Sequence, residues 1–248
     1  EFDFSQLEVA VLAHVTGDLQ LIDDIKHGRD IHSELFKQMF KRFPTKDERK
    51  WFKRLTFGLI YGAGAKTLAE NAGCDIHVAK EFIRTFYSRY PSVQLWNIEI
   101  EKRSRIESKY EAGETIKTFR MKTETGRLYV FKEYLSKFSD TKTHTFSPTE
   151  LKNYPVQGLA TGDIVPMMLG ILFRKLVGRD DVKLVNTVHD SILLDVKDTV
   201  LTTIIKEVKQ TLNNTHKYFE ATFNKPLALK LTAGVQVGKN WYDMEEIK

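Results

Sequence analysis

Strand-like segments stand near the two ends of this 248-residue chain, with a long block of helical pattern between them. Residues 2–16 have the pattern of a strand that runs into a helix, residues 183–196 that of a hairpin, and residues 227–238 that of a final strand. Residues 19–148 are rich in charge and mostly helical in pattern. We therefore expect an α+β fold, in which an antiparallel sheet is interrupted by a large helical insertion, rather than a doubly wound fold.

The helical block contains its own start and turn signals. Thr45 and Glu48 have the spacing of a capping box, so a helix is expected to begin there. Residues 114–131 have the pattern of a hairpin that turns at Gly126. The most loop-like segment, residues 139–150, is expected to mark the end of the insertion. The expected parts of the chain are therefore residues 1–25, 26–149 and 150–248.

Composition indicates the class of protein more clearly than the function. Hydrophobic residues make up 42% and charged residues 29%, which is ordinary for a globular protein. The net charge of +5 gives weak support to a polyanionic partner. The lone Cys74 excludes an internal disulfide and a cysteine-based zinc site. The longest strongly apolar run, Ile164–Phe173, is too short to cross a bilayer, and no signal peptide is visible, so we expect a cytoplasmic protein without a membrane partner.

Two aspartates stand in apolar, strand-like surroundings at opposite ends of the chain. Asp190 lies in "TVHDSILLDV" and Asp3 lies in "EFDFSQLEVAVLAH". Burying a lone carboxylate costs several kcal/mol unless a cation meets it, and carboxylate oxygens are the ligands that Mg²⁺ prefers. Either aspartate alone is as well explained by a satisfied buried carboxylate or a turn residue. On neighbouring strands, the two together predict a divalent-metal site.

One face of the helix that begins near Glu48 carries cationic and aromatic side chains. Arg49, Lys53, Phe57 and Tyr61 follow one another at steps of four residues, and each step rotates by only about 40°, so all four share one side. The two cations suit phosphate groups, and the two rings suit a base or a sugar. The alternative is an amphipathic surface helix with extended cationic side chains and two partly buried rings.

The opposite side of the same helix is expected to pack into the core. It carries Trp51, Leu55 and Leu59. Gly62 and Gly64 follow the helix, and their lack of a side chain would let a backbone or a template base come close.

Several segments resemble the motifs of the family A (DNA polymerase I-like) DNA polymerases, in the same order. "DFSQLEVAVLAH" resembles motif A, "RKWFKRLTFGLIYG" motif B and "VHDSI" motif C, and "NYPVQGLATGDI" and "GKNW" also resemble family segments. The resemblance implies a right-hand polymerase fold, with residues 1–25 and 150–248 in the palm and residues 26–149 as fingers. In the family the thumb and any exonuclease domain lie upstream of motif A. The resemblance therefore implies a further N-terminal segment or a second chain, and by analogy a bacteriophage origin.

By this resemblance, the chain would add dNTPs to a primer 3′-hydroxyl with the help of two Mg²⁺ ions. Asp3 and Asp190 would be the catalytic, metal-binding pair, with the Phe4 carbonyl as a further ligand. Arg49, Lys53 and His32 would hold the triphosphate. The remaining implied residues are Phe57 at the nucleotide, Tyr61 at the new base pair, Glu8 at the 2′ side of the sugar, Gln6 in the same motif without a refined role, and Asn153, Gln157 and His189 at the primer–template DNA.

Most of these residues have a plainer interpretation. His14, His32 and His189 are equally explained as core histidines bonded to backbone, with that interpretation preferred for His14. Glu8 could be a solvated helix residue, and Asn153 could cap a following helix.

Three positions depart from the family pattern. Ser191 stands where a third carboxylate is common, Thr149 where an arginine toward the primer is often found, and Thr56 where motif B usually has asparagine. Ser191 puts a third catalytic carboxylate in doubt, and Thr149 puts a contact to the primer in doubt.

Two other functions remain open. A single-subunit RNA polymerase shares the plan of three motifs, although Glu8 and Phe57 favour a DNA enzyme. A non-catalytic nucleic-acid-binding subunit is also consistent with the fold, although it would not need both aspartates and both cations.

Overall fold

The computed structural model of the protein describes residues 1–135 and 143–247. The chain forms two compact units: unit 1 is Glu1–His14 with Gln157–Lys248, and unit 2 is Val15–Val156. The sequence placed the boundaries after residues 25 and 149. The compact units divide the chain at two other points. The first falls inside α1 (Leu7–Thr16) and the second at the end of α8 (Pro148–Gln157).

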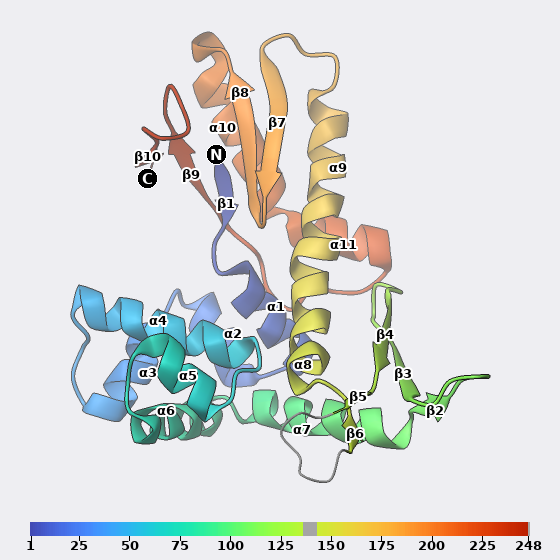
Figure 1. Ribbon diagram of the computed structural model, residues 1–248. Coiled ribbons are helices and arrows are strands. Elements are labelled where there is room, and N and C mark those ends of the chain that lie inside the picture. Colours follow the sequence, from blue (N-terminus) through green and yellow to red (C-terminus); the bar gives the residue numbers. More distant parts are fainter. Residues whose placement is uncertain (136–142, 248) are drawn as a thin grey trace. The chain divides into compact units, whose positions relative to one another are not determined.

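Unit 1 is built on an antiparallel sheet of five strands in the order β10-β9-β1-β8-β7 (Figure 1). The strands are β1 (Phe2–Phe4), β7 (Val182–Val188), β8 (Ser191–Val196), β9 (Ala233–Val237) and β10 (Glu245–Ile247). β7 and β8 form the expected hairpin, and β1 lies between β8 and β9. Both ends of the chain therefore share one sheet, and the predicted α+β arrangement is confirmed.

Helices flank this sheet. They are the π-helix η1 (Gly158–Ile164), α9 (Val165–Leu176), the short 3₁₀-helix η2 (Asp198–Val200), α10 (Leu201–Asn213) and α11 (Thr215–Phe223). α9 contacts β7, and α10 contacts β9. Ile204, Val208 and Leu212 of α10 are fully buried, and their spacing of four residues explains why one face of the helix packs inward.

The helix that begins at Pro148 is longer than the sequence suggests. α8, η1 and α9 follow one another without a break as far as Leu176. Pro166 stands in the first turn of α9, directly after the π-helical segment, and does not end the helix. The run of 29 residues contains a stretch with a mean hydropathy of 1.5, which passes a length and composition test for a membrane span. This is weak evidence, because 44% of that stretch is buried and core helices pass the same test.

Unit 2 is mainly helical. Its helices are α2 (Leu19–Lys26), α3 (Ile31–Phe40), α4 (Lys46–Ile60), α5 (Ala65–Ala72), α6 (Ile76–Arg89) and α7 (Pro91–Ile106). Rings from three helices meet in its core, where Phe36 and Phe82 lie 4.9 and 5.4 Å from Phe52. The capping box of Thr45 and Glu48 is present at the start of α4, as predicted.

Short strands complete unit 2. β2 (Lys109–Tyr110), β3 (Lys117–Lys122) and β4 (Leu128–Lys132) form one sheet, and β5 (Tyr134–Leu135) pairs with β6 (His144–Thr145). The predicted hairpin turn is confirmed, with Gly126 at a φ of 88° that favours glycine. The predicted loop at 139–150 lies partly outside the described residues, and β6 and the start of α8 take up part of the remainder.

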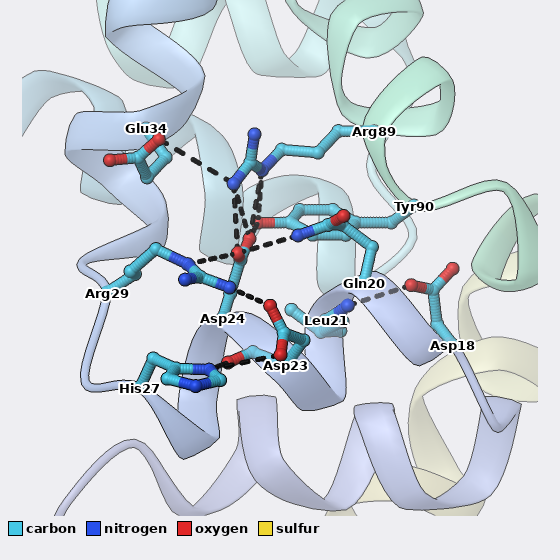
Figure 2. A network of polar contacts seen from close by, with 10 residues as sticks. All are labelled: Asp18, Gln20, Leu21, Asp23, Asp24, His27, Arg29, Glu34, Arg89 and Tyr90. Atoms are coloured by element: carbon cyan, nitrogen blue, oxygen red, sulfur yellow. Dashed lines mark hydrogen bonds and ion pairs between the residues drawn. The ribbon is translucent and has the colours of Figure 1, made fainter.

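A buried ionic network joins α2 to the end of α6 (Figure 2). Asp24 is fully buried, and its carboxylate accepts hydrogen bonds from Gln20, Arg29, Arg89 and Tyr90. Nε and Nη2 of Arg89 lie 2.9 and 2.7 Å from Oδ2 of Asp24. Burial acts to raise the pKa of Asp24, but the hydrogen bonds from Arg29, Tyr90 and Arg89 hold that pKa below its ordinary value. The network therefore keeps a buried carboxylate ionised.

Candidate active site

Asp3 and Asp190 come from neighbouring strands of unit 1. Asp3 pairs with Ser191 across β1 and β8, and Asp190 directly precedes β8 in the two-residue turn after β7. The backbone N–H of Phe4 donates to the carbonyl oxygen of Asp190 at 3.3 Å. The fold therefore brings two carboxylates from opposite ends of the chain to one edge of the sheet, as the sequence predicted.

The expected burial of these aspartates is wrong. Successive side chains of a strand point to opposite faces, so Phe2 and Phe4 are only 4% and 2% exposed while Asp3 between them is exposed. Asp190 is half-buried. β7 is the edge strand of the sheet, and its Val185 is 57% exposed. The cost of burying a charge therefore does not explain these carboxylates.

The turn that follows Asp3 and the turn that carries Asp190 both contain strained backbone. Among the residues that the structure describes, four residues other than glycine have a positive φ, namely Gln6, Lys41, His189 and Asn224. Gln6, at 53°, ends the segment that follows Asp3, and His189, at 55°, precedes Asp190. Such conformations cost about 1–3 kcal/mol and concentrate at functional sites. The sequence offered no signal for this strain, because neither residue is glycine or asparagine.

The donor set at these turns suits a hard divalent cation. Two aspartate carboxylates stand there, and the carbonyl of Phe4 belongs to the same short segment. Ser191 is buried opposite Asp3, so no third carboxylate occupies that position. Within the described ranges, no group of three or more His, Cys, Asp or Glu side chains is placed to hold a metal. A metal at this edge would therefore depend on Asp3 and Asp190.

The stripe on α4 in unit 2 is fully exposed only at its cationic end. Arg49 and Lys53 are exposed, and Phe57 and Tyr61 are half-buried. The Lys53 ammonium lies 5.6 Å from the centre of the Phe57 ring, and the rings of Phe57 and Tyr61 are 6.1 Å apart. Lys53, Phe57 and Tyr61 therefore form one continuous row, and Arg49 lies one helical turn before it.

The opposite face of α4 is buried mostly as expected. Leu55 and Leu59 lie in the core, but Trp51 is only half-buried. Phe52 and Thr56, which the sequence did not assign to this face, are fully buried instead. The core face is thus rotated toward Phe52.

Arg49 has a partner that sequence reasoning missed. Its Nε and Nη2 lie 2.9 and 2.8 Å from the two carboxylate oxygens of Asp30, which also caps α3 by accepting from the Ser33 N–H. Burial acts to raise the pKa of Asp30, but hydrogen bonds from Arg49 and Ser33 lower it below the ordinary value. Lys53 makes no ion pair with any residue that the structure describes, so of the two cations of the stripe it is the one more open to an added anion.

His32 lies under this stripe. It is 3% exposed, its Nδ1 is 3.1 Å from Thr56 Oγ1, and its ring centre is 5.8 Å from that of Phe57. Burial lowers the pKa of His32 to about 4, with further lowering by Arg49 and Lys53 and an opposing effect of Asp30. His32 is therefore buried, but its bond goes to a side-chain hydroxyl and not to the backbone.

The remaining predicted residues fall on α1, α8 and the β7–β8 turn. Glu8 is half-buried in the first turn of α1. Asn153 and Gln157 lie four residues apart inside α8, so Asn153 does not cap a following helix. His189 is exposed and therefore not a core residue, whereas Nδ1 of His14 accepts from the Ala228 N–H, which agrees with the structural role preferred for it.

Gly62 lies close to another segment of the same chain. Its φ is 83°, and an added Cβ would stand 2.9 Å from the Cα of Thr149. Gly64 has open space around the same position. Of the two expected neighbours, a backbone or a template base, it is therefore the backbone of Thr149 that comes close to Gly62.

Comparisons with known proteins agree with these motifs. The model of DNA polymerase family A matches residues 1–243. DNA polymerase I of Lactococcus lactis subsp. lactis is 32% identical over 97% of this chain, and thermostable DNA polymerase I of Thermus aquaticus is 27% identical over 98%. The chain spans only 25% and 27% of the length of these two relatives.

A solved structure shows the same fold. It is the POL domain of Pol1 from M. smegmatis in complex with DNA primer-template and dNTP, with a TM-score of 0.70 and 22% identity. The likeness covers 97% of this chain and 39% of that one. At this identity it shows the fold alone, which is the right-hand polymerase fold that the motifs predicted. Since the family model matches nearly every residue, the chain belongs to DNA polymerase family A.

Proposed function

We propose that this chain is the catalytic portion of a template-directed DNA polymerase, which adds dNTPs to the 3′-hydroxyl of a primer. The observation that carries the proposal is the convergence of Asp3 and Asp190 at one edge of the sheet, in a chain of this family. Two exposed or half-buried carboxylates beside strained turns suit a bound ligand better than a structural role.

Asp3, Asp190 and the Phe4 carbonyl would hold two Mg²⁺ ions. Bound there, the ions would favour ionisation of the primer hydroxyl and neutralise charge on the phosphates. The backbone hydrogen bond between Phe4 and Asp190 holds β1 beside the turn that carries Asp190.

Unit 2 would supply the contacts to the nucleotide. Lys53, Arg49 and His32 would bind the triphosphate, and Arg49 would exchange its bond to Asp30 for one to phosphate. Phe57 would stack on the nucleotide and Tyr61 would lie at the new base pair.

The sugar and the duplex would be contacted by the other predicted residues. Glu8 would exclude ribonucleotides by closing the 2′ side of the sugar, and Gln6 belongs to the same segment. Asn153, Gln157 and His189 would contact primer–template DNA, with phosphate contacts that make binding sensitive to salt.

The wider assignment follows from the family. Residues 1–25 and 150–248 would be the palm and residues 26–149 the fingers, and a further polymerase segment or second chain would supply the thumb and any exonuclease. A cytoplasmic location, including a host cytoplasm for a bacteriophage enzyme, completes the proposal.

Primer extension tests the proposed function. The purified chain is given Mg²⁺, dNTPs and a primer–template, beside Asp190→Asn and the matched variant Asp195→Asn, which alters an exposed aspartate of β8. Extension is expected from the parent and from Asp195→Asn, with a loss of at least about 1000-fold in Asp190→Asn. Equal extension by all three would refute the role of Asp190. DNA binding without extension by any of them, even with the N-terminal part of its protein added, would favour a non-catalytic subunit.

A further inference from the structure

His32 and Thr56 form a hydrogen-bonded pair whose direction can be derived. The His32 Nδ1 lies 3.1 Å from Thr56 Oγ1, which lies 2.8 Å from the carbonyl oxygen of Phe52. Two oxygens at 2.8 Å need a hydrogen between them, so the Thr56 hydroxyl donates to Phe52. Its oxygen is then the acceptor for His32. The proton of the neutral ring must therefore sit on Nδ1.

The other ring nitrogen is the one left for a ligand. Nε2 of His32 makes no hydrogen bond within the part of the chain that the structure describes. The surrounding protein atoms do not fully enclose it, so a ligand or solvent can reach it. With the proton on Nδ1, Nε2 carries a lone pair. That lone pair repels the oxygens of a phosphate, so the neutral ring cannot donate to one.

We propose that Thr56 is a positioning residue that holds His32 in the Nδ1–H tautomer, so that His32 binds a triphosphate only after Nε2 takes up a proton from solvent. Nucleotide binding is then coupled to the uptake of one proton. The proposal deepens the proposed function and rests on it, because it takes His32 as a triphosphate contact.

The charges around His32 make this coupling effective. Asp30 acts on the ring from the start of α3, and Arg49 and Lys53 act from α4. Burial and the two cations keep the free ring neutral near pH 7. A triphosphate brings negative charge toward the same cations, which offsets their effect and favours the imidazolium. Both ring nitrogens then donate, Nδ1 to Thr56 and Nε2 to phosphate.

The tautomer is tested without any nucleotide. In the ¹⁵N-histidine-labelled chain at pH 7.5, with the His32 signals assigned by His32→Gln, we expect a protonated Nδ1 and a bare Nε2. Thr56→Ser keeps the hydroxyl and should keep this pattern, whereas the nearly isosteric Thr56→Val should shift the proton to Nε2. A bare Nδ1 in the parent chain, or an unchanged pattern in Thr56→Val, would overturn the role of Thr56. The parent and Thr56→Ser decide the question even if Thr56→Val does not fold.

Proton uptake is tested with dATP and Mg²⁺. Calorimetry in two buffers of different ionisation enthalpy should show about one proton taken up per dATP bound by the parent. The dissociation constant should rise about tenfold from pH 7.5 to 8.5, and less than about threefold in Thr56→Val, whose Nε2–H donates directly.

The outcomes separate this inference from the proposed function. Binding of dATP with no proton uptake, and with His32 still neutral in the ¹⁵N spectrum, overturns the coupling but leaves nucleotide binding intact. No dATP binding by any variant would instead contradict the phosphate-binding stripe, while the tautomer experiment still decides what Thr56 does.

Discussion

Asp24 in unit 2 and Asp190 in unit 1 are carboxylates in opposite surroundings. Asp24 is fully buried and accepts hydrogen bonds from four side chains, two of them arginines (Figure 2). Asp190 is half-buried in a hairpin turn and makes no ion pair with any residue in the ranges that the structure describes. One carboxylate is satisfied by the protein, and the other is left for a cation that the protein does not supply.

This difference separates a structural acid from a functional one. A buried carboxylate stabilises a fold only when cations and donors replace its water, and then it is closed to ligands. A carboxylate at an open sheet edge contributes little to folding, and its backbone can be held in a strained turn for another purpose. The comparison predicts that the two acids respond in opposite ways to substitution.

The largest effect on stability is expected for Asp24→Asn. It removes the buried anion that Arg89 and Arg29 share and leaves them only the more exposed Glu34 and Asp23, which should lower the free energy of unfolding by about 3–5 kcal/mol. Urea unfolding followed by circular dichroism measures this loss. Asp23→Asn, at the half-buried neighbour that also pairs with Arg29, should cost no more than about 1 kcal/mol. Equal losses in the two variants would break the comparison.

A second test uses pH. The pKa of His32 is lowered to about 4 by burial, so the unfolded chain binds more protons than the folded chain between about pH 6.5 and 4. Stability should therefore fall as the pH drops through this window, by about 3 kcal/mol from His32. His32→Gln should lack that part of the pH dependence. Protonation of Asp24 should also lower the free energy of unfolding, but only at lower pH, because the pKa of Asp24 is held below its ordinary value.

Tyr90→Phe sharpens the comparison within the Asp24 network. The Tyr90 hydroxyl donates to Oδ2 of Asp24 at 2.8 Å, but Arg29 and Arg89 remain bonded when it is removed. We expect a loss of about 1–2 kcal/mol in urea unfolding. A loss as large as that of Asp24→Asn would mean that the hydroxyl, and not the arginines, holds the network together.

The smallest effect on stability is expected for Asp190→Asn. The substitution keeps the shape of the side chain at a half-buried turn and breaks no ion pair within the described residues, so the free energy of unfolding should change by no more than about 0.5 kcal/mol. Urea unfolding of the parent and the variant provides the check. A loss of about 3 kcal/mol or more would place Asp190 with Asp24 as a structural residue.

Most of the fold and much of the candidate site could be predicted from local sequence patterns. The side chains of α4 share a stripe because helical periodicity alone determines it, and the capping box at Thr45 is a local bond between near neighbours. The β7–β8 hairpin is likewise a local feature, so its position followed from the apolar segments on both sides of His189.

Long-range pairings could not be predicted in the same way. Asp24 and Arg89 are separated by 65 residues, and nothing in either segment marks them as partners. The burial of Asp3 was misjudged because an apolar segment of three strand residues does not reveal which face is covered. The π-helical geometry of Gly158–Ile164, between α8 and α9, was not predicted from the sequence.

Binding of Mn²⁺ to the isolated chain tests the central claim most directly. Mn²⁺ replaces Mg²⁺ at oxygen sites and broadens the amide signals of nearby residues. In a titration followed by ¹⁵N NMR, broadening should centre on Phe4, Asp190 and Ser191, persist in Asp195→Asn and weaken at least about tenfold in Asp190→Asn. The same broadening in Asp190→Asn, or broadening centred elsewhere in the chain, would contradict the assignment of Asp3 and Asp190 as the metal-binding pair.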